Sequence, residues 1–198
     1  MSNFIDNKLQ IIGTEEQVEE VRAFISSVDE KGVKRAIDFN RILPMPQELN
    51  IANSFRAALV HFLLFGGSNQ HYLTVKKAQK TFIEWEEAVK REAIELAFRY
   101  QENLEKYGEA TWYTWRNKNW GPDENAEDDP TRSNTTDTLH FLTSWNTPVP
   151  VIMALSKRFP LVTLQLVREE DEETGIFRLT TFHQGTIVSD EKQTAAIG

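Results

Sequence analysis

The sequence predicts an α+β fold in which a mostly antiparallel sheet carries a large helical insertion. Short apolar runs near both ends of the chain have the period of strands, and helical runs lie beside them. The middle of the chain, about residues 51–137, instead has long helical periodicity followed by a tryptophan-rich and then an acidic stretch. A chain of 198 residues suits one domain. We therefore expect a single domain over residues 1–198 with this insertion inside it.

The first expected elements are a strand and a helix. Asn7–Ile12 alternates as a half-buried strand does. Thr14 suits a helix N-cap, and Gln17, three residues later, completes a capping box. Apolar residues continue at helical spacing, and the helix is expected to stop near Lys31–Gly32 because glycine favours helix ends.

The next segments predict a second strand and two helical stretches. Ala36–Leu43 is interpreted as extended, and Pro44 ends it because proline cannot donate to a strand ladder. Ile51–Phe65 is expected to be a helix, although Leu59–Phe65 could also be a strand. A continuous helix over Val75–Tyr107 would reach about 50 Å. We therefore expect it to break or to pack as a hairpin.

The C-terminal third predicts two hairpin strands preceded by a strand and a helix. Leu139–Trp145 is interpreted as a strand, and Pro148 or Pro150 suits the first turn of the helix that follows. Leu161–Val167 and Ile176–Phe182 are expected to pair across an acidic turn. The last ten or so residues are expected to fray.

Without the insertion, the order of elements is strand, helix, strand, then strand, helix, strand, strand. This is the split βαβ arrangement of a ferredoxin-like fold with an extra edge strand. The helical insertion then falls between the second and third core strands, and the helices are expected on one face of the antiparallel sheet.

Composition excludes several classes of function. The chain has no cysteine, which excludes disulfides, thiolate nucleophiles and cysteine-ligated metal sites. The first residues do not have the pattern of a secretory signal, and no segment has the length and hydrophobicity of a membrane span, so a cytoplasmic location is expected. The net charge of −8 disfavours broad nucleic-acid affinity.

The histidines do not predict a metal or catalytic site. No two of them have the three- or four-residue spacing that places a metal pair on one helix face. His140 and His183 fall on expected strands and could be neighbours, although ordinary strand residues are the simpler interpretation. The sequence also has no nucleophile-elbow or phosphate-loop pattern. We expect no catalytic residues, no metal, no cofactor and no enzymatic activity.

The tryptophan-rich segment is the most informative candidate for binding. Aromatic rings, cations and amides alternate there, and this composition can stack on a ligand and bond to it. The alternative is that the rings only cover the open face of the sheet. Trp145, which precedes an expected helix start, could complete a pocket with this segment. The candidate binding residues are Trp112, Trp115, Arg116, Asn119, Trp120 and Trp145.

Three segments carry a resemblance to a known family. They are Phe39–Pro46, Tyr107–Gly121 with its Trp-Tyr-Thr-Trp-Arg string, and Thr143–Pro148. Together they resemble the Api-like phage and plasmid proteins that contain a YubB-type ferredoxin-like domain. The chain departs from the family pattern at Pro122–Ala126, where two acids replace a basic and an aromatic residue. The resemblance implies a protein carried by mobile genetic elements and a fold, but no activity.

The sequence therefore favours a non-enzymatic interaction module of a phage or mobile element that binds a protein partner through the tryptophan-rich insertion. Two alternatives stay open. One is nucleic-acid binding by tryptophan stacking, which the net charge disfavours, and the other is an acidic mimic of DNA. Self-association through the long helix is a further expectation, and no membrane partner is expected.

Overall fold

The computed structural model describes residues 4–28, 32, 34–66, 74–171 and 176–194. The chain forms two units, one made of residues 1–44 and 116–198 and the other of residues 45–115. We call them the sheet unit and the helical unit, and we describe each by itself. The single domain with an insertion over residues 51–137 stays a prediction.

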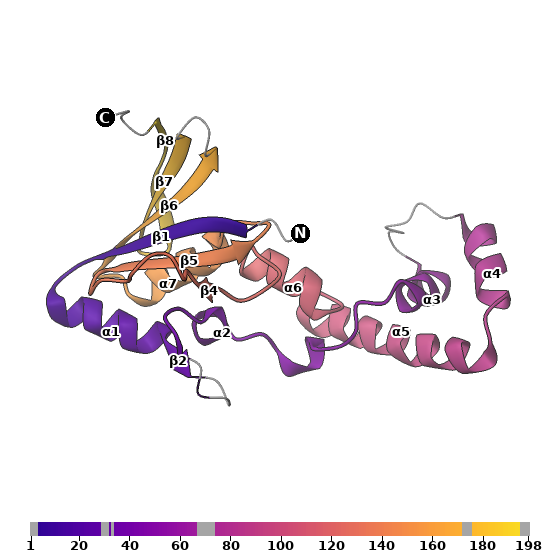
Figure 1. The fold of residues 1–198 in the computed structure, drawn as a ribbon. Coiled ribbons are helices and arrows are strands. Elements are labelled where there is room, and N and C mark those ends of the chain that lie inside the picture. Colours follow the sequence, from indigo (N-terminus) through magenta and orange to yellow (C-terminus); the bar gives the residue numbers. More distant parts are fainter. Residues whose placement is uncertain (1–3, 29–31, 33, 67–73, 172–175, 195–198) are drawn as a thin grey trace. The chain divides into compact units, whose positions relative to one another are not determined.

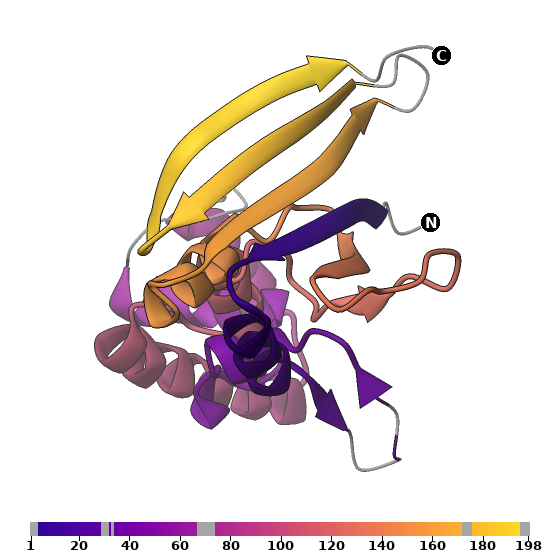
Figure 2. The same ribbon diagram turned by 90° about the vertical axis from the view of Figure 1, so that its left-hand side faces the viewer.

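The main sheet of the sheet unit has six described strands in the order β4-β5-β1-β6-β7-β8, with every neighbouring pair antiparallel. The sheet curves over the helices of its unit (Figures 1 and 2). The mixed α+β class and the mostly antiparallel sheet are therefore confirmed. The strands are β1 (Phe4–Ile12), β4 (Glu127–Asp128), β5 (Thr138–Ser144), β6 (Thr163–Asp171), β7 (Ile176–His183) and β8 (Thr186–Thr194).

β1 lies at the centre of the sheet and supplies its core. Leu9 lies between Leu139 of β5 and Leu166 of β6, and Ile11 lies opposite Leu164. All five side chains are almost completely buried. This face is covered by α1 (Glu15–Ile25) and α7 (Val149–Arg158), as Figure 2 shows. The apolar alternation that predicted these strands is thus the alternation of core and open faces.

The start of α1 is confirmed in detail, and its end is not. The Gln17 amide donates to Thr14 Oγ1 at 3.3 Å, and the Thr14 amide donates to Gln17 Oε1 at 2.9 Å, which completes the capping box. The expected stop near Lys31–Gly32 is wrong, because the helix ends at Ile25. Ser27–Val28 (β2) then pairs with Lys34–Arg35 (β3) as a separate small hairpin.

The strand expected over Ala36–Leu43 is also wrong, because Phe39–Ile42 is a short helix, α2. Side chains bind the backbone amides that a strand would use. The Phe39 amide donates to Asn125 Oδ1 at 2.9 Å, and the Asn40 amide donates to Asp38 Oδ1 at 2.9 Å. The edge position beside β5 is taken by β4 instead.

The fraying expected for about the last ten residues is wrong over residues 189–194, because β8 continues to pair with β7. The rest of that prediction, over residues 195–198, lies outside the described residues. Asp190 links the edge strand β8 to its neighbour β7 through two side-chain bonds. Its Oδ1 accepts from Thr180 Oγ1 at 2.7 Å, and its Oδ2 pairs with Arg178 Nη1 at 2.9 Å. These bonds, that from Thr180 first, lower the pKa of Asp190.

The helical unit packs α3 (Phe55–Phe65) against α5 (Glu87–Tyr107). The expected long helix breaks, since α4 (Val75–Ile83) ends at Ile83 and α5 begins at Glu87. Ala57 packs with Tyr100, whose hydroxyl accepts from the Ser54 amide at 2.8 Å. A one-turn 3-10 helix precedes α3, and α6 (Trp112–Asn119) follows α5. No helix in the described ranges has both the length and the hydrophobicity needed to cross a bilayer.

Candidate functional site

Trp120 is a core residue of the sheet unit. It is 2% exposed, and its indole Nε1 donates to the Leu43 carbonyl at 2.9 Å. Its ring meets Phe39 edge to face, with ring centroids 6.0 Å apart. The Arg116 guanidinium lies 4.9 Å from the ring centroid, and Arg116 Nη1 donates to the Asp123 carbonyl at 3.3 Å. Burial lowers the pKa of Arg116. The contacts of Arg116 and Trp120 therefore indicate that both residues stabilise the fold of the sheet unit.

The other members of the tryptophan-rich segment divide between the two units. Trp112 and Trp115 belong to the helical unit, whereas Asn119 belongs to the sheet unit. Trp115 is buried, and Trp112 is half-buried with its ring edge to face on Tyr113 at 5.6 Å. Asn119 is half-buried at the end of α6. The binding role of these residues stays a prediction.

Trp145, the last of the predicted candidates, is 60% exposed. It follows β5 and has a φ of 58°, a left-handed conformation that costs a residue with a Cβ about 1–2 kcal/mol. The Asn146 amide donates to the Ser144 carbonyl at 2.6 Å, so Trp145 is the central residue of a γ-turn. The form of this turn with positive φ is rare and strained. The backbone therefore holds the indole outward at some cost in stability.

The loop of residues 144–149, which we call the Trp145 loop, is fixed at both ends. Ser144 Oγ donates to Asp123 Oδ1 at 2.6 Å, and Thr143 Oγ1 donates to the Asn146 carbonyl at 2.9 Å. Arg168 Nη1 on β6 donates to Thr147 Oγ1 at 2.9 Å. Because these bonds come from other strands and loops, the loop is ordered before any ligand arrives.

Beside this loop lies an open cavity of about 470 Å³. Gly121, at a φ of 102°, forms part of its wall, and a Cβ there would collide with the Thr147 carbonyl oxygen. Only glycine allows this close approach. The cavity combines an indole face, amide groups and a guanidinium, which suits stacking and hydrogen bonding. The described lining residues are Ile5, Asn117, Gly121, Trp145, Asn146, Thr147, Val149 and Arg168.

Sequence reasoning missed most of this cavity. Asn146 and Thr147 could have been inferred from their place between Trp145 and the first proline of the helix start. Asn117 lies in the tryptophan-rich segment that was expected to form a pocket with Trp145, although it was not itself a candidate. Arg168 gave no signal, because only the pairing of β6 with β1 brings it to the loop.

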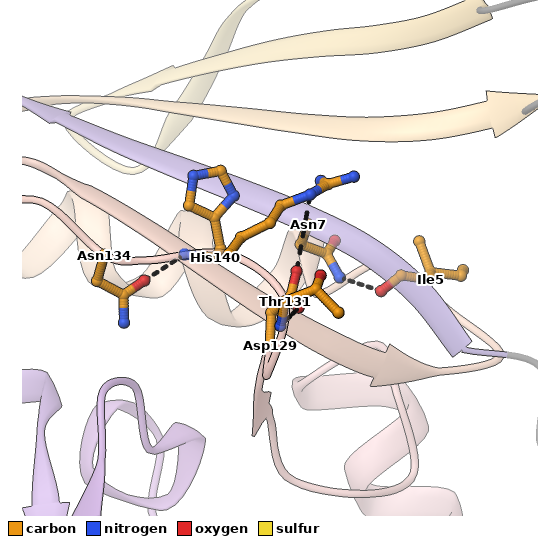
Figure 3. Close-up of polar contacts among 7 residues, drawn as sticks. Ile5, Asn7, Asp129, Thr131, Asn134 and His140 are labelled. Carbon is orange, nitrogen blue, oxygen red and sulfur yellow. Dashed lines mark hydrogen bonds and ion pairs between the residues drawn. The ribbon is translucent and has the colours of Figure 1, made fainter.

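A second polar cluster surrounds His140 on the open face of the sheet (Figure 3). The His140 amide donates to Asn134 Oδ1 at 2.7 Å, and the ring Nδ1 is buried with no hydrogen-bond partner in the described structure. Burial lowers the pKa of His140, and the positive charges of Arg132 and Lys8 lower it further. The ring is therefore neutral near pH 7.

Asp129 lies close to this ring, but its carboxylate oxygens interact with Thr131 and Arg132 of its own loop. Its Oδ1 accepts from both the amide and the hydroxyl of Thr131 at 2.7 Å, and its Oδ2 lies 3.8 Å from Arg132 Nε (Figure 3). The bonds from Thr131, the hydroxyl first, lower the pKa of Asp129. Only 4% of this side chain is exposed. The carboxylate stabilises the loop before β5.

His140 and His183 are not neighbours, contrary to the possibility raised by the sequence. His140 lies opposite Lys8, Lys8 opposite Val167, and Val167 opposite Leu179. His183 is four residues further along β7. Since neighbouring strands are about 4.8 Å apart, the two histidines are separated by roughly 14 Å across the sheet alone. In the described ranges, no group of three or more His, Asp or Glu side chains is placed to hold a metal ion.

Comparisons with known proteins give one structural likeness. No protein-family model and no curated protein matches the chain. Among solved structures, the chain is similar to protein api92 from Yersinia pseudotuberculosis, which carries the family model DUF1281. The two share 11% sequence identity and a TM-score of 0.45, with 100% of both chains covered. At this level the likeness supports no functional argument.

Proposed function

We propose that this chain is a non-enzymatic interaction module that binds a protein partner through the Trp145 loop. The observation that carries the proposal is Trp145 itself, a 60% exposed indole held outward by a strained backbone. Strained residues of this kind persist where the surroundings enforce them, and they cluster at functional sites.

The chemistry of the loop fits a protein ligand. Tryptophan and arginine are the residues most enriched among interface hot spots, and here Trp145 and Arg168 line the same cavity. The bond that Asp123 accepts from Ser144 and the bonds that Thr143 and Arg168 donate restrict the loop in advance, which reduces the ordering cost of binding. A partner side chain that enters the cavity can pack on the indole while its polar atoms bond to the amides of Asn117 and Asn146.

The proposal moves the predicted contact from the tryptophan-rich insertion to the Trp145 loop. Trp120 and Trp115 are buried, so neither ring offers an open face for a base to stack on. Nucleic-acid binding, the first alternative, therefore has less support than protein binding. The acidic DNA mimic stays an alternative: Glu124, Glu127 and Asp128 of the first acidic run are exposed, whereas Asp129 is buried among its loop partners.

We further infer that the sheet unit is a ferredoxin-like core with two added strands. The order β4-β5-β1-β6, with α1 following β1 and α7 between β5 and β6, supports this inference. β4 would then be the second core strand, so the helical insertion would precede this strand and not follow it as the sequence suggested. The link to phage and mobile elements rests on the sequence resemblance alone.

A capture experiment tests the proposed function. The wild-type chain and the variants Trp145→Ala and Tyr113→Ala are immobilised, and proteins retained from a lysate of cells that carry the gene are quantified. Tyr113 is the matched control, since it is an aromatic residue that is 40% exposed. We expect Trp145→Ala to lose proteins that wild type and Tyr113→Ala retain, with the melting temperatures of all three close together.

Retention of the same proteins by Trp145→Ala, or no specific retention by wild type, contradicts the proposal. A titration with single-stranded DNA at low salt serves as the second arm, because electrostatic binding is strongest there. Binding of DNA that Trp145→Ala abolishes favours the nucleic-acid alternative instead.

A further inference from the structure

A second open cavity in the sheet unit lies between α1 and the turn that follows α7. Its volume is about 530 Å³, within the roughly 300–1,000 Å³ of small-molecule sites. Arg158 and Glu20 are the charged residues among those described in its wall. Much of the rest of the wall is apolar and consists of Phe24, Phe159, Pro160, Leu161 and Val162. The cavity therefore combines an apolar surface with one cation and one anion.

The guanidinium of Arg158 rests on an aromatic surface in this wall. Its central carbon lies 4.2 Å from the centre of the Phe24 ring and 6.0 Å from that of Phe159. The two rings meet edge to face, with centroids 5.4 Å apart. A guanidinium that stacks on a ring keeps its N–H groups in its own plane, where they can still donate hydrogen bonds. The aromatic pair therefore orients Arg158 before a ligand arrives.

The N–H groups of Arg158 have no acceptor in the part of the chain that the structure describes. The side chain is exposed, and it forms neither a hydrogen bond nor an ion pair there, Glu20 included. Arg22 and Arg41, by contrast, each donate to a backbone carbonyl, at 2.7 Å and 2.8 Å. Those two arginines stabilise the fold around α1. Arg158 is instead an oriented cation whose donors match the two oxygens of a carboxylate.

The turn after α7 adds an exposed apolar side chain to the same cavity. The Val162 amide donates to the Phe159 carbonyl at 3.2 Å, which closes a β-turn. Pro160 and Leu161 are the central residues of this turn, and Leu161 is 75% exposed. Proline at the first central position restricts the backbone of the turn. The apolar part of the wall is therefore held in place next to the oriented guanidinium.

We propose that this cavity binds a small carboxylic acid with an apolar body. The carboxylate accepts hydrogen bonds from Arg158, and the apolar body packs against Phe159 and Leu161. The volume of the cavity suits one such molecule, since ligand sites of this size are mostly apolar with a few polar groups that fix orientation. The site lies apart from the Trp145 cavity, shares no described lining residue with it and does not depend on the proposed function.

The charges of the wall favour an acid with a single negative charge. Arg158 attracts an anion, whereas Glu20 in the same wall repels one. A phosphate group with two negative charges is therefore disfavoured relative to a carboxylate, which carries one. A neutral ligand of the same shape gains the apolar contacts but not the charge-assisted bonds.

A pair of matched probes tests the proposal. Hydrocinnamate and its neutral amide, hydrocinnamamide, have the same apolar body and differ in charge. Each is titrated into the isotope-labelled chain at low salt, and the backbone amide shifts are followed by two-dimensional NMR. We expect hydrocinnamate to shift the amides of the cavity residues in a saturable way, with a dissociation constant of roughly millimolar order. Hydrocinnamamide should bind about tenfold more weakly, because it lacks the charge that Arg158 recognises.

Three variants assign the effect to the wall charges. Arg158→Gln should weaken hydrocinnamate binding about tenfold, because it removes the cation. Lys157→Gln is the matched control, since it removes the neighbouring exposed cation, which is not among the described lining residues. It should bind hydrocinnamate as wild type does. Glu20→Gln should bind it about twofold more tightly, because a repelling charge is lost.

The same spectra report whether each variant is folded. If Arg158→Gln does not fold, the comparison of the acid with its amide in wild type decides. Equal binding of acid and amide overturns the proposal, as do a folded Arg158→Gln that binds like wild type and a wild type without saturable shifts at the cavity.

The free end of a partner chain is the other source of such a carboxylate. N-acetyl-leucyl-phenylalanine with a free C-terminus represents it in the same titration. We expect this peptide to bind more weakly than hydrocinnamate, because its peptide groups would lose hydrogen bonds to water in an apolar cavity. Tighter binding of the peptide overturns the assignment to a small acid.

Discussion

Trp120 and Trp145 are both in the sheet unit, and each follows the end of a helix or strand, but Trp120 is buried and Trp145 is exposed. Trp120, just after α6, is 2% exposed, and its Nε1 is bonded to the Leu43 carbonyl. Trp145, just after β5, is 60% exposed in a left-handed turn. The same residue type therefore stabilises the core in one region and is held out to solvent in the other.

The difference comes from the segments around each ring. Trp120 packs against Phe39 and donates to the Leu43 carbonyl, so burial satisfies both its apolar body and its one donor. Around Trp145, hydrogen bonds fix the backbone and leave the ring outside. Clustering of aromatic residues in a sequence therefore does not locate a binding surface, since the same composition suits a core.

The largest expected effect comes from truncating the two rings. Trp120→Ala should lower the free energy of unfolding by about 4 kcal/mol, because it leaves a large cavity and an unpaired Leu43 carbonyl. Trp145→Ala should lower it by about 1 kcal/mol or less. Urea unfolding of both variants measures the difference. Equal losses would show that Trp145 is part of the core and would remove the contrast.

The next effect concerns the close approach of Gly121 to the Trp145 loop. Gly121→Ala should cost about 3 kcal/mol, because the new Cβ meets the Thr147 carbonyl in addition to the left-handed strain. Gly108→Ala is the matched control. Gly108 has a φ of 73° with open space around it, so only the strain of about 1 kcal/mol is expected. Similar unfolding midpoints for the two variants would contradict the close packing.

A smaller effect measures the backbone strain at Trp145. Trp145→Gly and Trp145→Ala remove the same ring, but only glycine adopts the positive φ without strain. Trp145→Gly should therefore be more stable than Trp145→Ala by about 1 kcal/mol in urea unfolding. If the alanine variant is the more stable one, the turn is not strained, and the main support for the proposed site is lost.

The smallest effect concerns the bond between Arg168 and Thr147. A double-mutant cycle with Arg168→Met and Thr147→Val should give a coupling energy of about 0.5–1 kcal/mol, the usual net worth of one such bond. Unfolding of the wild type, both single variants and the double variant provides the four values. A coupling of zero would mean that the loop is held without help from β6.

The sequence predicted local elements better than their neighbours in space. The capping box at Thr14 was read correctly, because both of its bonds lie within four residues. The strand expected over Ala36–Leu43 failed because Asn125, far along the chain, binds the Phe39 amide. The frayed C-terminus failed for a similar reason, since Asp190 gains its partners only when β7 and β8 pair. The candidate cavity followed the same pattern: Trp145, a residue that the sequence suggested, lines it, and Arg168, which also lines it, was not suggested.

The sequence by itself determined the mixed fold class, the central apolar strands and the capped start of α1, because periodicity and capping act over a few residues. Only the tertiary structure decided which tryptophan is buried and which is exposed. That choice depends on bonds and contacts between distant segments, such as Trp120 with Leu43 and Ser144 with Asp123. These contacts cannot be predicted from a local sequence pattern, because they form only when distant segments come together in the fold.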